Sequence, residues 1–495
     1  MENTLPSPDA PARPFRVAVI GAGISGLAAA WQIRRLRPEA ELAVFEQQHS
    51  VGGVLGTVRE NGFQVERSAD NFITTLPWGV QLCRELALED QLVTTHPDHR
   101  RAFVVWRGRL HPLPDGFLMM APTRLWPLAT TPLLSPLGKV RAAMEFFIPP
   151  RRDDNDESLA HFARRRLGRE VYERLVEPLV SAVYGADMER LSVLATLSRF
   201  REMERNYGSL IRAMRVQMAQ RRRAGTSRDG HSRESGARYS MFVTLQQGLQ
   251  ELVDRLAQHL PPGALRLGVG VTTIRRENDH WVLTLTDGHQ FVGDAVVVAT
   301  PAYAAAPLLC ELDGRLAEEL AAITYTGSVI LAVAYRREAV GHPLHGSGCV
   351  IPRIEGSPLL AVSFSSQKYP HLAPKGYVLL RVFAGGARHP ELVSLEDTQL
   401  VPLLRKEVER LLRIEGQPVQ HWLFRWSQAM PQYEVNHGDR LRRIAERLAA
   451  WPGLALAGNA YRGVGIPHCI QSGRQAAVRA LGLPVEDQQT SSSAF

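Results

Sequence analysis

The sequence predicts an α/β fold in which one domain is assembled from separate parts of the chain. Residues 16–20 form a buried strand run that leads into a glycine-rich turn, and a second apolar run follows at residues 42–45. Apolar strand runs return much later, at residues 291–298 and 454–457. Each of these pieces alone leaves an apolar face uncovered, so we expect them to share one sheet.

The turn after the first strand has the spacing G-x-G-x-x-G, and Glu46 ends the second strand run twenty residues after the last glycine. The glycines allow a tight turn, close approach of a pyrophosphate and close helix packing, while Glu46 would accept hydrogen bonds from a ribose hydroxyl. The alternative is a glycine-rich turn with a structural glutamate. We predict that a dinucleotide contacts Gly21, Ala22, Gly23, Ile24, Ser25, Gly26, Glu46 and Gln47.

A second glycine turn, Gly52-Gly53-Val54, follows Glu46. It lets the backbone pass close to a ligand. It resembles the double-glycine turn that follows the ribose-binding acid in FAD enzymes of the amine-oxidase type. The resemblance favours FAD over NAD, with Gly53 and Val54 beside the cofactor.

The remaining elements are predicted from periodicity. Residues 76–220 are predicted to be mostly helical, with proline-rich breaks, and residues 396–414 to form an amphipathic helix. Residues 265–271 and 281–286 are predicted strands, and Asp287-Gly288 is a predicted hairpin turn. We therefore predict a Rossmann-like FAD-binding domain from residues 14–75, 238–302 and 451–484, a mainly helical domain at 76–237, and a β-rich substrate domain at 303–450. Residues 1–13 and 485–495 are expected to be flexible tails.

Composition narrows the class of protein. Of 495 residues, 45% are hydrophobic and 22% charged, which is typical of a globular enzyme with more than one domain. The first 14 residues lack a secretory pattern, and the four dispersed cysteines read as reduced thiols, so we expect a cytoplasmic protein. The net charge of +8 is concentrated in residues 199–238, which lack interleaved aromatic residues, so we expect no nucleic-acid partner.

Membrane contact stays open at this point. No run reaches the ~20 apolar residues of a spanning helix. Residues 125–137 are uncharged but contain three prolines, so they could lie on a membrane or cover a core. Trp126, Phe146 and Phe147 hint at interfacial anchoring. A peripheral position at the inner face of the membrane is therefore kept beside the cytoplasmic prediction, and the oligomeric state is not predicted.

Several motifs together resemble the FAD-dependent protoporphyrinogen/coproporphyrinogen oxidases, over nearly the whole chain. Residues 63–72 resemble the family's glutamate-arginine-glycine-proline-aspartate-serine-phenylalanine stretch, with Ser68, Ala69 and Asn71 replacing glycine, proline and serine. Residues 183–192 are similar to a helix and loop near the substrate cavity. Residues 457–474 resemble the flavin-closing motif, with His468 where an aspartate is common.

The resemblance implies further contacts. Ser68, Ala69, Asp70, Asn71, Val271, Trp426, Val464, Gly465 and Ile466 would border the FAD, and the helix that starts there would stabilise negative charge on the reduced flavin. Phe383 and Val350 match the family's substrate-clamping positions. The family's substrate arginine would fall at Ala102. Arg101 is one residue earlier, and strand alternation would turn it the other way.

The activity implied is oxidation of a porphyrinogen to its porphyrin, by three hydride transfers to the flavin with O₂ as acceptor and H₂O₂ as product. The flavin performs the redox step, so no catalytic side chain and no metal are predicted. Coproporphyrinogen III and protoporphyrinogen IX both stay open, with abundant arginine favouring the first. A flavin amine oxidase is disfavoured because residues 327–333 contain no lysine. A non-catalytic scaffold like the GDP-dissociation inhibitors is the remaining alternative.

Overall fold

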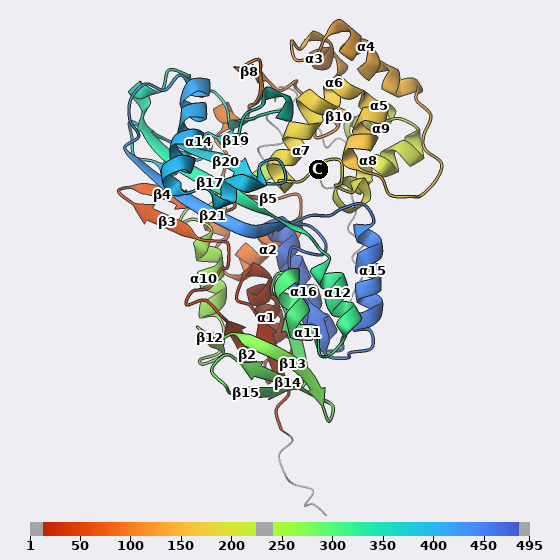
Figure 1. Cartoon of the computed structure of the whole chain (residues 1–495), viewed down its shortest axis with the longest axis vertical. Helices are drawn as coiled ribbons and strands as arrows, with labels where there is room; N and C mark the ends of the chain where they lie inside the picture. Colours follow the sequence, from red (N-terminus) through yellow and green to blue (C-terminus); the bar gives the residue numbers. More distant parts are fainter. Residues whose placement is uncertain (1–12, 224–240, 485–495) are drawn as a thin grey trace, which may run out of the picture.

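The computed structural model describes residues 13–223 and 241–484 (Figure 1). Except for Arg13, the two predicted tails lie outside the described residues. So does the part of the basic segment that follows residue 223. In the described part the molecule has a lower lobe around a parallel sheet and an upper lobe in which a larger sheet faces a group of helices (Figure 1).

Five parallel strands form the sheet of the lower lobe. Their order is β12 (Leu265–Leu267), β2 (Glu41–Glu46), β1 (Arg16–Ile20), β16 (Ala295–Val298) and β22 (Leu454–Leu456). Every neighbouring pair is parallel. The prediction that distant segments share one sheet is confirmed, whereas the domain boundaries given above stay a prediction.

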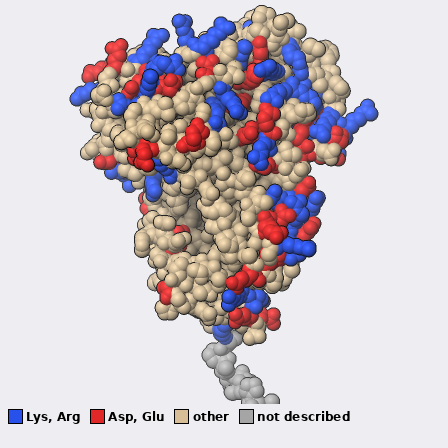
Figure 2. All heavy atoms as spheres, viewed as in Figure 1, with Lys and Arg blue, Asp and Glu red and all other residues tan. Residues whose placement is uncertain are grey.

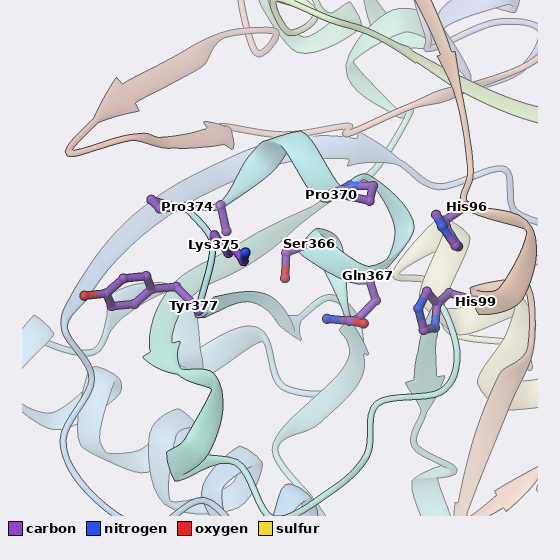
Figure 3. A pocket seen from close by; sticks show the side chains of 10 residues that line it. His96, His99, Ser366, Gln367, Pro370, Pro374, Lys375 and Tyr377 are labelled. Atoms are coloured by element: carbon purple, nitrogen blue, oxygen red, sulfur yellow. The ribbon is translucent and has the colours of Figure 1, made fainter.

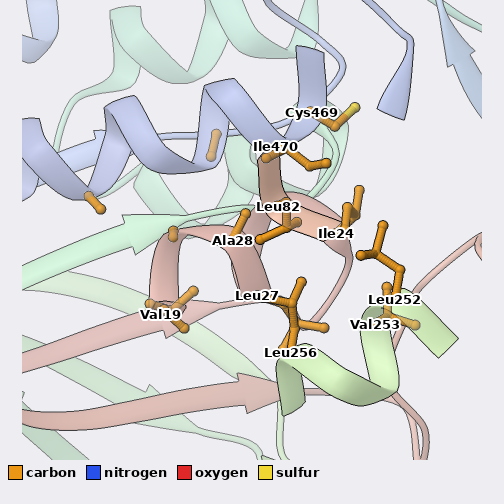
Figure 4. Packing of buried hydrophobic residues seen from close by; sticks show 14 of the residues in the cluster. Val19, Ile24, Leu27, Ala28, Leu82, Leu252, Val253, Leu256, Cys469 and Ile470 are labelled. Carbon is orange, nitrogen blue, oxygen red and sulfur yellow. The ribbon is translucent and has the colours of Figure 1, made fainter. Parts of the chain in front are cut away.

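Both faces of this sheet are covered. On one face lie α1 (Ile24–Leu36), α16 (Ile466–Ala480), α10 (Gln250–Gln258) and α2 (Pro77–Glu85), around the buried cluster seen in Figure 4. The other face of the sheet, to which every second side chain of β1 and β16 points, contacts a second buried cluster. This cluster includes three antiparallel strands and three helices: β13 (Val271–Glu277), β14 (His280–Leu285), β15 (Gln290–Gly293), α11 (Ala302–Leu309), α12 (Gly314–Ala321) and α15 (His437–Leu448). Burial on both faces explains the continuous apolar runs in the sequence.

Two strand predictions need correction. The strand expected at residues 265–271 ends at Leu267, and Val271 begins β13 instead, because Gly268 adopts φ +74° and turns the chain. The single run at 291–298 is two strands in different sheets. It divides at Asp294, whose carboxylate and N–H bond the backbone of Arg16. The hairpin turn at Asp287-Gly288 is confirmed, with Gly288 at φ +84°.

The upper lobe contains a seven-stranded sheet. Its order is β21 (Gln420–Pro431), β17 (Tyr325–Arg336), β20 (Tyr377–Gly385), β19 (Leu359–Ser363), β18 (Gly348–Val350), β7 (Ala102–Trp106) and β8 (Arg109–Pro112). Helix α14 (Asp397–Leu412), predicted as amphipathic, covers one face. The sequence pattern at residues 76–220 missed β7 and β8, because these short strands lie between proline-rich breaks.

Helices dominate between residues 125 and 223. They are α3 (Leu125–Thr130), α4 (Pro136–Ala143), α5 (Leu159–Leu167), α6 (Arg169–Val171), α7 (Glu177–Tyr184), α8 (Val193–Tyr207) and α9 (Leu210–Arg223). The apolar residues that recur there at helical spacing are all buried, in a cluster that reaches the upper sheet through Val104 and, at its edge, Val350: they are Leu159, Phe162, Ala163, Leu167, Val171 and Leu175. The α/β fold class with a β-rich and a helical part is confirmed. Within residues 13–223 and 241–484, no helix is long and apolar enough to cross a bilayer.

Short strands join the lobes: β3 (Thr57–Glu60) and β4 (Phe63–Glu66) form a hairpin, and β5 (Phe72–Ile73) pairs with β11 (Phe242–Leu245), which pairs with β6 (Leu92–Thr94). On the face shown in Figure 2, acidic and basic side chains are interspersed over the upper lobe and along one flank.

Candidate active site

The glycine turn after β1 has the geometry that a pyrophosphate needs. Gly21 adopts φ +99°, and a Cβ atom on Gly26 would lie 1.9 Å from the Gly21 carbonyl oxygen. A Cβ on Gly23, in contrast, would meet nothing within 4 Å, so the space in front of Gly23 is open. The N-cap residue of α1 is Gly23, which has no side chain to accept hydrogen bonds from the first N–H groups of the helix. This end of α1 is available to an anion.

The second glycine turn lies directly against the first. Gly52 N–H donates to the Ala22 carbonyl at 2.9 Å, and Gly53, at φ +60°, approaches the Cα atom of Gly23. The Glu46 carboxylate accepts from the N–H groups of Ala22 at 2.7 Å and Gln48 at 2.9 Å. The predicted ribose acid is thus fixed at the carboxyl end of β2, beside the turn. Val54 is 42% exposed.

The strand connections place Val271 near the same edge. Val269 N–H donates to the Glu46 carbonyl at 3.0 Å, and the Cβ position of Gly270 is 3.6 Å from the Gln47 side chain. Val271 therefore starts β13 close to Glu46 and Gln47. The structure thus brings Val271, which the resemblance places beside the FAD, close to the predicted ribose acid Glu46.

Residues 67–71 follow β4 and contact two strands of the upper sheet, β20 and β21. The Trp426 indole N–H donates to the Arg67 carbonyl at 3.0 Å, with the Arg67 guanidinium 5.3 Å from the indole centroid. Asn71 donates to the Asp70 carboxylate at 2.8 Å. Ala69, between them, is exposed. Trp426 and the segment of Ser68, Ala69, Asp70 and Asn71 are therefore neighbours, although more than 350 residues separate them in the chain.

The closing motif runs from β22 into α16. Gly465 caps α16 without a side-chain hydrogen bond, so the helix that starts at Ile466 has no side-chain cap at its N-terminus. Val464 packs against the helical cluster of the upper lobe. A Cβ on Gly473 would lie 2.0 Å from the Ser25 carbonyl, which shows how closely α16 and α1 pack. The two helices therefore pack directly against each other.

His468 replaces the family's aspartate in this motif. Its ring lies 5.9 Å from the Trp78 ring, and a Cβ on Gly463 would be 2.4 Å from it. Burial lowers the pKa of His468, so the imidazole is neutral at pH 7. A neutral, partly buried side chain therefore lies near the start of α16.

The two predicted substrate-clamping residues share one face of the upper sheet. Val350 pairs with Ala361, Ala361 with Phe383, and Phe383 with Ile330. Residues directly opposite each other in a sheet point to the same face. Arg101 is exposed and precedes β7, in which Ala102 and Val104 share the face of Val350. Alternation turns Arg101 to the other face, so the structure does not bring it to Phe383.

Several buried hydroxyl groups around this region have no hydrogen-bond partner. They are Ser68 Oγ, Thr300 Oγ1 and Tyr461 Oη, which follow β4, β16 and β22 in the chain. A buried polar group without a partner is costly, and it often marks the place of a ligand. Together with the open Gly23 and the uncapped α1 and α16, these atoms fit an elongated polar cofactor such as FAD.

Sequence reasoning missed three functional candidates. Arg381 and Lys368 both approach the Asp70 carboxylate, and Tyr433 bonds the closing loop. Arg381 lies two positions before Phe383, so strand alternation places it on the same face as that predicted residue. No local pattern marks Lys368 or Tyr433.

A separate pocket lies in the upper lobe (Figure 3). It has a volume of about 250 Å³ and is lined by residues that include His96, His99, Gln367 and Lys375. None of the predicted site residues lines it.

Comparison with known proteins agrees with this geometry. The family model of flavin containing amine oxidoreductases matches residues 24–481. The chain belongs to this family. It is 34% identical to coproporphyrinogen III oxidase of Bacillus subtilis, over 94% of this chain and 97% of the relative, and 30% identical to the chloroplastic protoporphyrinogen oxidase of Nicotiana tabacum, over 96% and 86%. A solved structure from Exiguobacterium sp. 255-15 has 30% identity and a TM-score of 0.82, covering 94% of this chain and 98% of that one.

Membership of the flavin containing amine oxidoreductases settles the cofactor class. With the dinucleotide turn at Gly21 to Gly26, the flavin is FAD, as predicted. The resemblance to the porphyrinogen oxidases is also confirmed, because relatives with those names cover nearly the whole chain. The protein is therefore a flavin-dependent oxidoreductase.

Proposed function

We propose that this flavoenzyme oxidises a porphyrinogen to the porphyrin in haem biosynthesis, with coproporphyrinogen III favoured over protoporphyrinogen IX. The observation that carries the proposal is the match, over 97% of its length, to a relative named coproporphyrinogen III oxidase. The protoporphyrinogen oxidase named above is less similar, at 30% identity. The absence of a lysine from residues 327–333 of β17 supports this proposal over amine oxidation.

The chemistry is a six-electron oxidation. When bound, FAD supplies a two-electron acceptor, so that three hydride transfers convert the methylene-bridged macrocycle into an aromatic one. We assign O₂ as the final acceptor, which gives three H₂O₂ per porphyrin and balances the six hydrogens removed. Three protons leave with the three hydrides, two from pyrrole nitrogens and one from a bridge carbon, as aromaticity develops, and no side chain needs to act as a strong base.

The chain's own residues would then bind, orient and exclude water. The first turn of α1, with Gly23 and Ser25, would hold the phosphates, and Glu46 the ribose. The segment from Ser68 to Asn71, with Trp426, would border the isoalloxazine, whose negative charge on reduction would face the start of α16 at Ile466. Phe383 and Val350 would form the apolar wall of the substrate site. Arg101 is not part of this proposal, because it lies on the other face of the sheet.

The test uses the purified protein loaded with FAD in air. We expect a fluorescent porphyrin from one or both porphyrinogens, with three O₂ consumed per porphyrin and a faster rate on coproporphyrinogen III. Turnover of an amine with neither porphyrinogen oxidised would favour the amine oxidase alternative. A protein that stays colourless after FAD is added would favour the scaffold.

We also propose peripheral contact with a lipid bilayer through a surface that we call the apolar crown. Its members are the exposed side chains Leu125, Trp126, Leu137, Val140, Met144 and Phe147. Trp126, Leu137 and Phe147 are 78%, 82% and 82% exposed. The last four members are spaced as one helical stripe along α4 and the turn after it, at the top of the molecule (Figure 1).

The composition of the apolar crown supports a lipid partner. Aromatic and aliphatic side chains on short surface helices enter the interfacial region of a bilayer, and basic neighbours favour acidic lipids. Arg212, whose guanidinium lies 4.7 Å from the Phe146 ring centroid, is exposed beside the crown. Lys139 lies within α4.

The crown is tested by sedimentation with vesicles of neutral and acidic phospholipid. We expect Trp126→Ser/Phe147→Ser to bind at least about tenfold more weakly, because each ring contributes about 1.5–3 kcal/mol when buried. The matched control is Leu403→Ser/Val419→Ser, which removes exposed apolar side chains from another surface. If the unchanged protein does not bind the vesicles, the crown has no role in membrane contact. If the unchanged protein forms dimers and the double variant does not, the crown is a dimer interface instead.

A further inference from the structure

A group of buried charges lies under the segment that follows Arg67. The Asp70 carboxylate accepts a hydrogen bond from Lys368 Nζ at 2.7 Å and lies 3.3 Å from Arg381 Nη1. Only 12% of the Asp70 side chain, 10% of that of Lys368 and 1% of that of Arg381 are exposed. Two cations therefore face a single carboxylate in a place that water hardly reaches.

The carboxylate in this group is ionised. Burial alone would raise the pKa of Asp70, but the charges of Lys368 and Arg381 hold it below its ordinary value. Two more titratable groups among the described residues face the cluster. Burial raises the pKa of the Glu66 carboxyl to about 7. Burial and the charge of Asp70 raise the pKa of Tyr369, whose ring centroid lies 5.8 Å from Lys368 Nζ, so its hydroxyl is neutral. At pH 6, where Glu66 is mostly neutral, the cluster carries one positive charge in excess.

The cluster is joined to the proposed flavin-binding segment. Arg381 Nη2 donates to the Ser68 carbonyl, and its guanidinium lies 5.2 Å from the Phe383 ring centroid. Nε and Nη1 of Arg381 are buried and have no hydrogen-bond partner. The excess charge is thus only partly compensated within the protein, at the point where the flavin segment meets the substrate-clamping face.

We infer that Lys368 and Arg381, held by Asp70, raise the reduction potential of the bound flavin by favouring its negatively charged reduced form. The inference rests on the proposed position of FAD beside Ser68 to Asn71. A buried charge is poorly screened, so it acts on a neighbouring ring without touching it. Neither residue is placed on the reacting atoms, and both are positioning residues for the redox step.

The decisive measurement is the midpoint potential of the FAD-loaded protein at pH 6. Lys368→Met removes the excess charge while keeping the length of the side chain. We expect the equilibrium preference for reduced flavin to fall about tenfold, which equals about 30 mV for a two-electron couple. The matched control is Lys375→Met, which removes a charge from an exposed lysine seven residues away and is expected to leave the potential unchanged.

A second variant separates charge from structure. Lys368→Met/Asp70→Asn restores one excess positive charge, on Arg381, although it removes the ion pair. We expect its potential to return toward that of the unchanged protein. A potential that stays low in the double variant would show that the ion pair acts through structure, and would overturn the inference.

The remaining outcomes are also distinct. FAD bound normally by Lys368→Met, with an unchanged potential, would overturn the inference and leave the proposed function standing. Failure of the unchanged protein to bind FAD would instead refute the proposed function, and the inference with it. If Lys368→Met is not recovered in folded form, Lys368→Gln makes the same charge change with a polar side chain.

Discussion

Glu66 shows at the scale of one residue how burial of an acid links stability to pH. Its side chain is buried, and burial raises the pKa of the carboxyl from 4.5 to about 7, against hydrogen bonds from Thr57 and the Leu249 N–H. Between pH 4.5 and 7 the folded protein therefore binds more protons at this site than the unfolded chain does. Stability contributed by Glu66 falls as the pH rises through this range and is constant above it.

We predict that Glu66→Gln stabilises the protein by up to about 3 kcal/mol at pH 8, because the cost of ionising the buried carboxyl is removed. The gain should shrink toward zero near pH 4.5. Denaturant unfolding at several pH values measures it, with exposed Glu39→Gln as the control. An equal effect of Glu66→Gln at pH 5 and pH 8 would contradict this explanation.

Residues differed in how well the sequence predicted their positions and contacts. Gly21, Gly26 and Glu46 were predictable because local backbone geometry and spacing alone demand these residue types. The ion pair of Asp70 with Lys368 was not predictable, because Lys368 lies 298 positions later and contacts Asp70 only in the folded structure. For Arg101, the sequence already indicated a side chain on the other face, because one position along a strand reverses the direction of the side chain.

At the scale of elements, the loop between β22 and α16 depends on one tyrosine. Tyr433 Oη accepts from the Gly463 N–H at 2.9 Å and donates to the Asn459 carbonyl, while its ring stacks on His437 with the centroids 4.5 Å apart. The loop thus enters α16 in a fixed shape, although it contains glycines.

We predict that Tyr433→Phe leaves two partly buried backbone groups, the Gly463 N–H and the Asn459 carbonyl, without this partner and costs about 1–3 kcal/mol of stability. Because the loop leads into the helix that would face the flavin, FAD should also bind at least several-fold more weakly. Fluorescence titration with FAD checks this. Tyr303→Phe, a change to a partly exposed tyrosine, should leave the affinity unchanged.

Element boundaries were predictable where a local signal marked them and not where tertiary contacts decided. The Asp287-Gly288 hairpin and α14 followed from turn residues and periodicity. The run at 291–298 gave no sign of its division, since Asp294 ends one strand by bonding the backbone of Arg16 far away. Likewise, β7 becomes a strand through its pairing with β18, almost 250 residues later.

For the whole molecule, the main consequence is that FAD binding and global stability are coupled. The parallel sheet joins strands near both ends of the chain with strands from the middle, and the proposed site lies at the carboxyl ends of β1, β2 and β22. A ligand that contacts these segments binds the folded chain only. We predict that FAD raises the free energy of unfolding by about 2.7 kcal/mol when its concentration is a hundredfold above its Kd.

The measurement is thermal unfolding of the FAD-free protein over a range of FAD concentrations. Because FAD binds only the folded chain, Tm should rise continuously with FAD concentration. Because the segments belong to one sheet, pulse proteolysis during heating, with lower-lobe β1 and upper-lobe β17 peptides as the two reporters, should give the same shift in both. FMN, which lacks the adenosine half that Glu46 and Val271 would hold, should raise Tm much less. Equal stabilisation by FMN, or a shift confined to one reporter, would show that the ends of the chain are not joined through the cofactor.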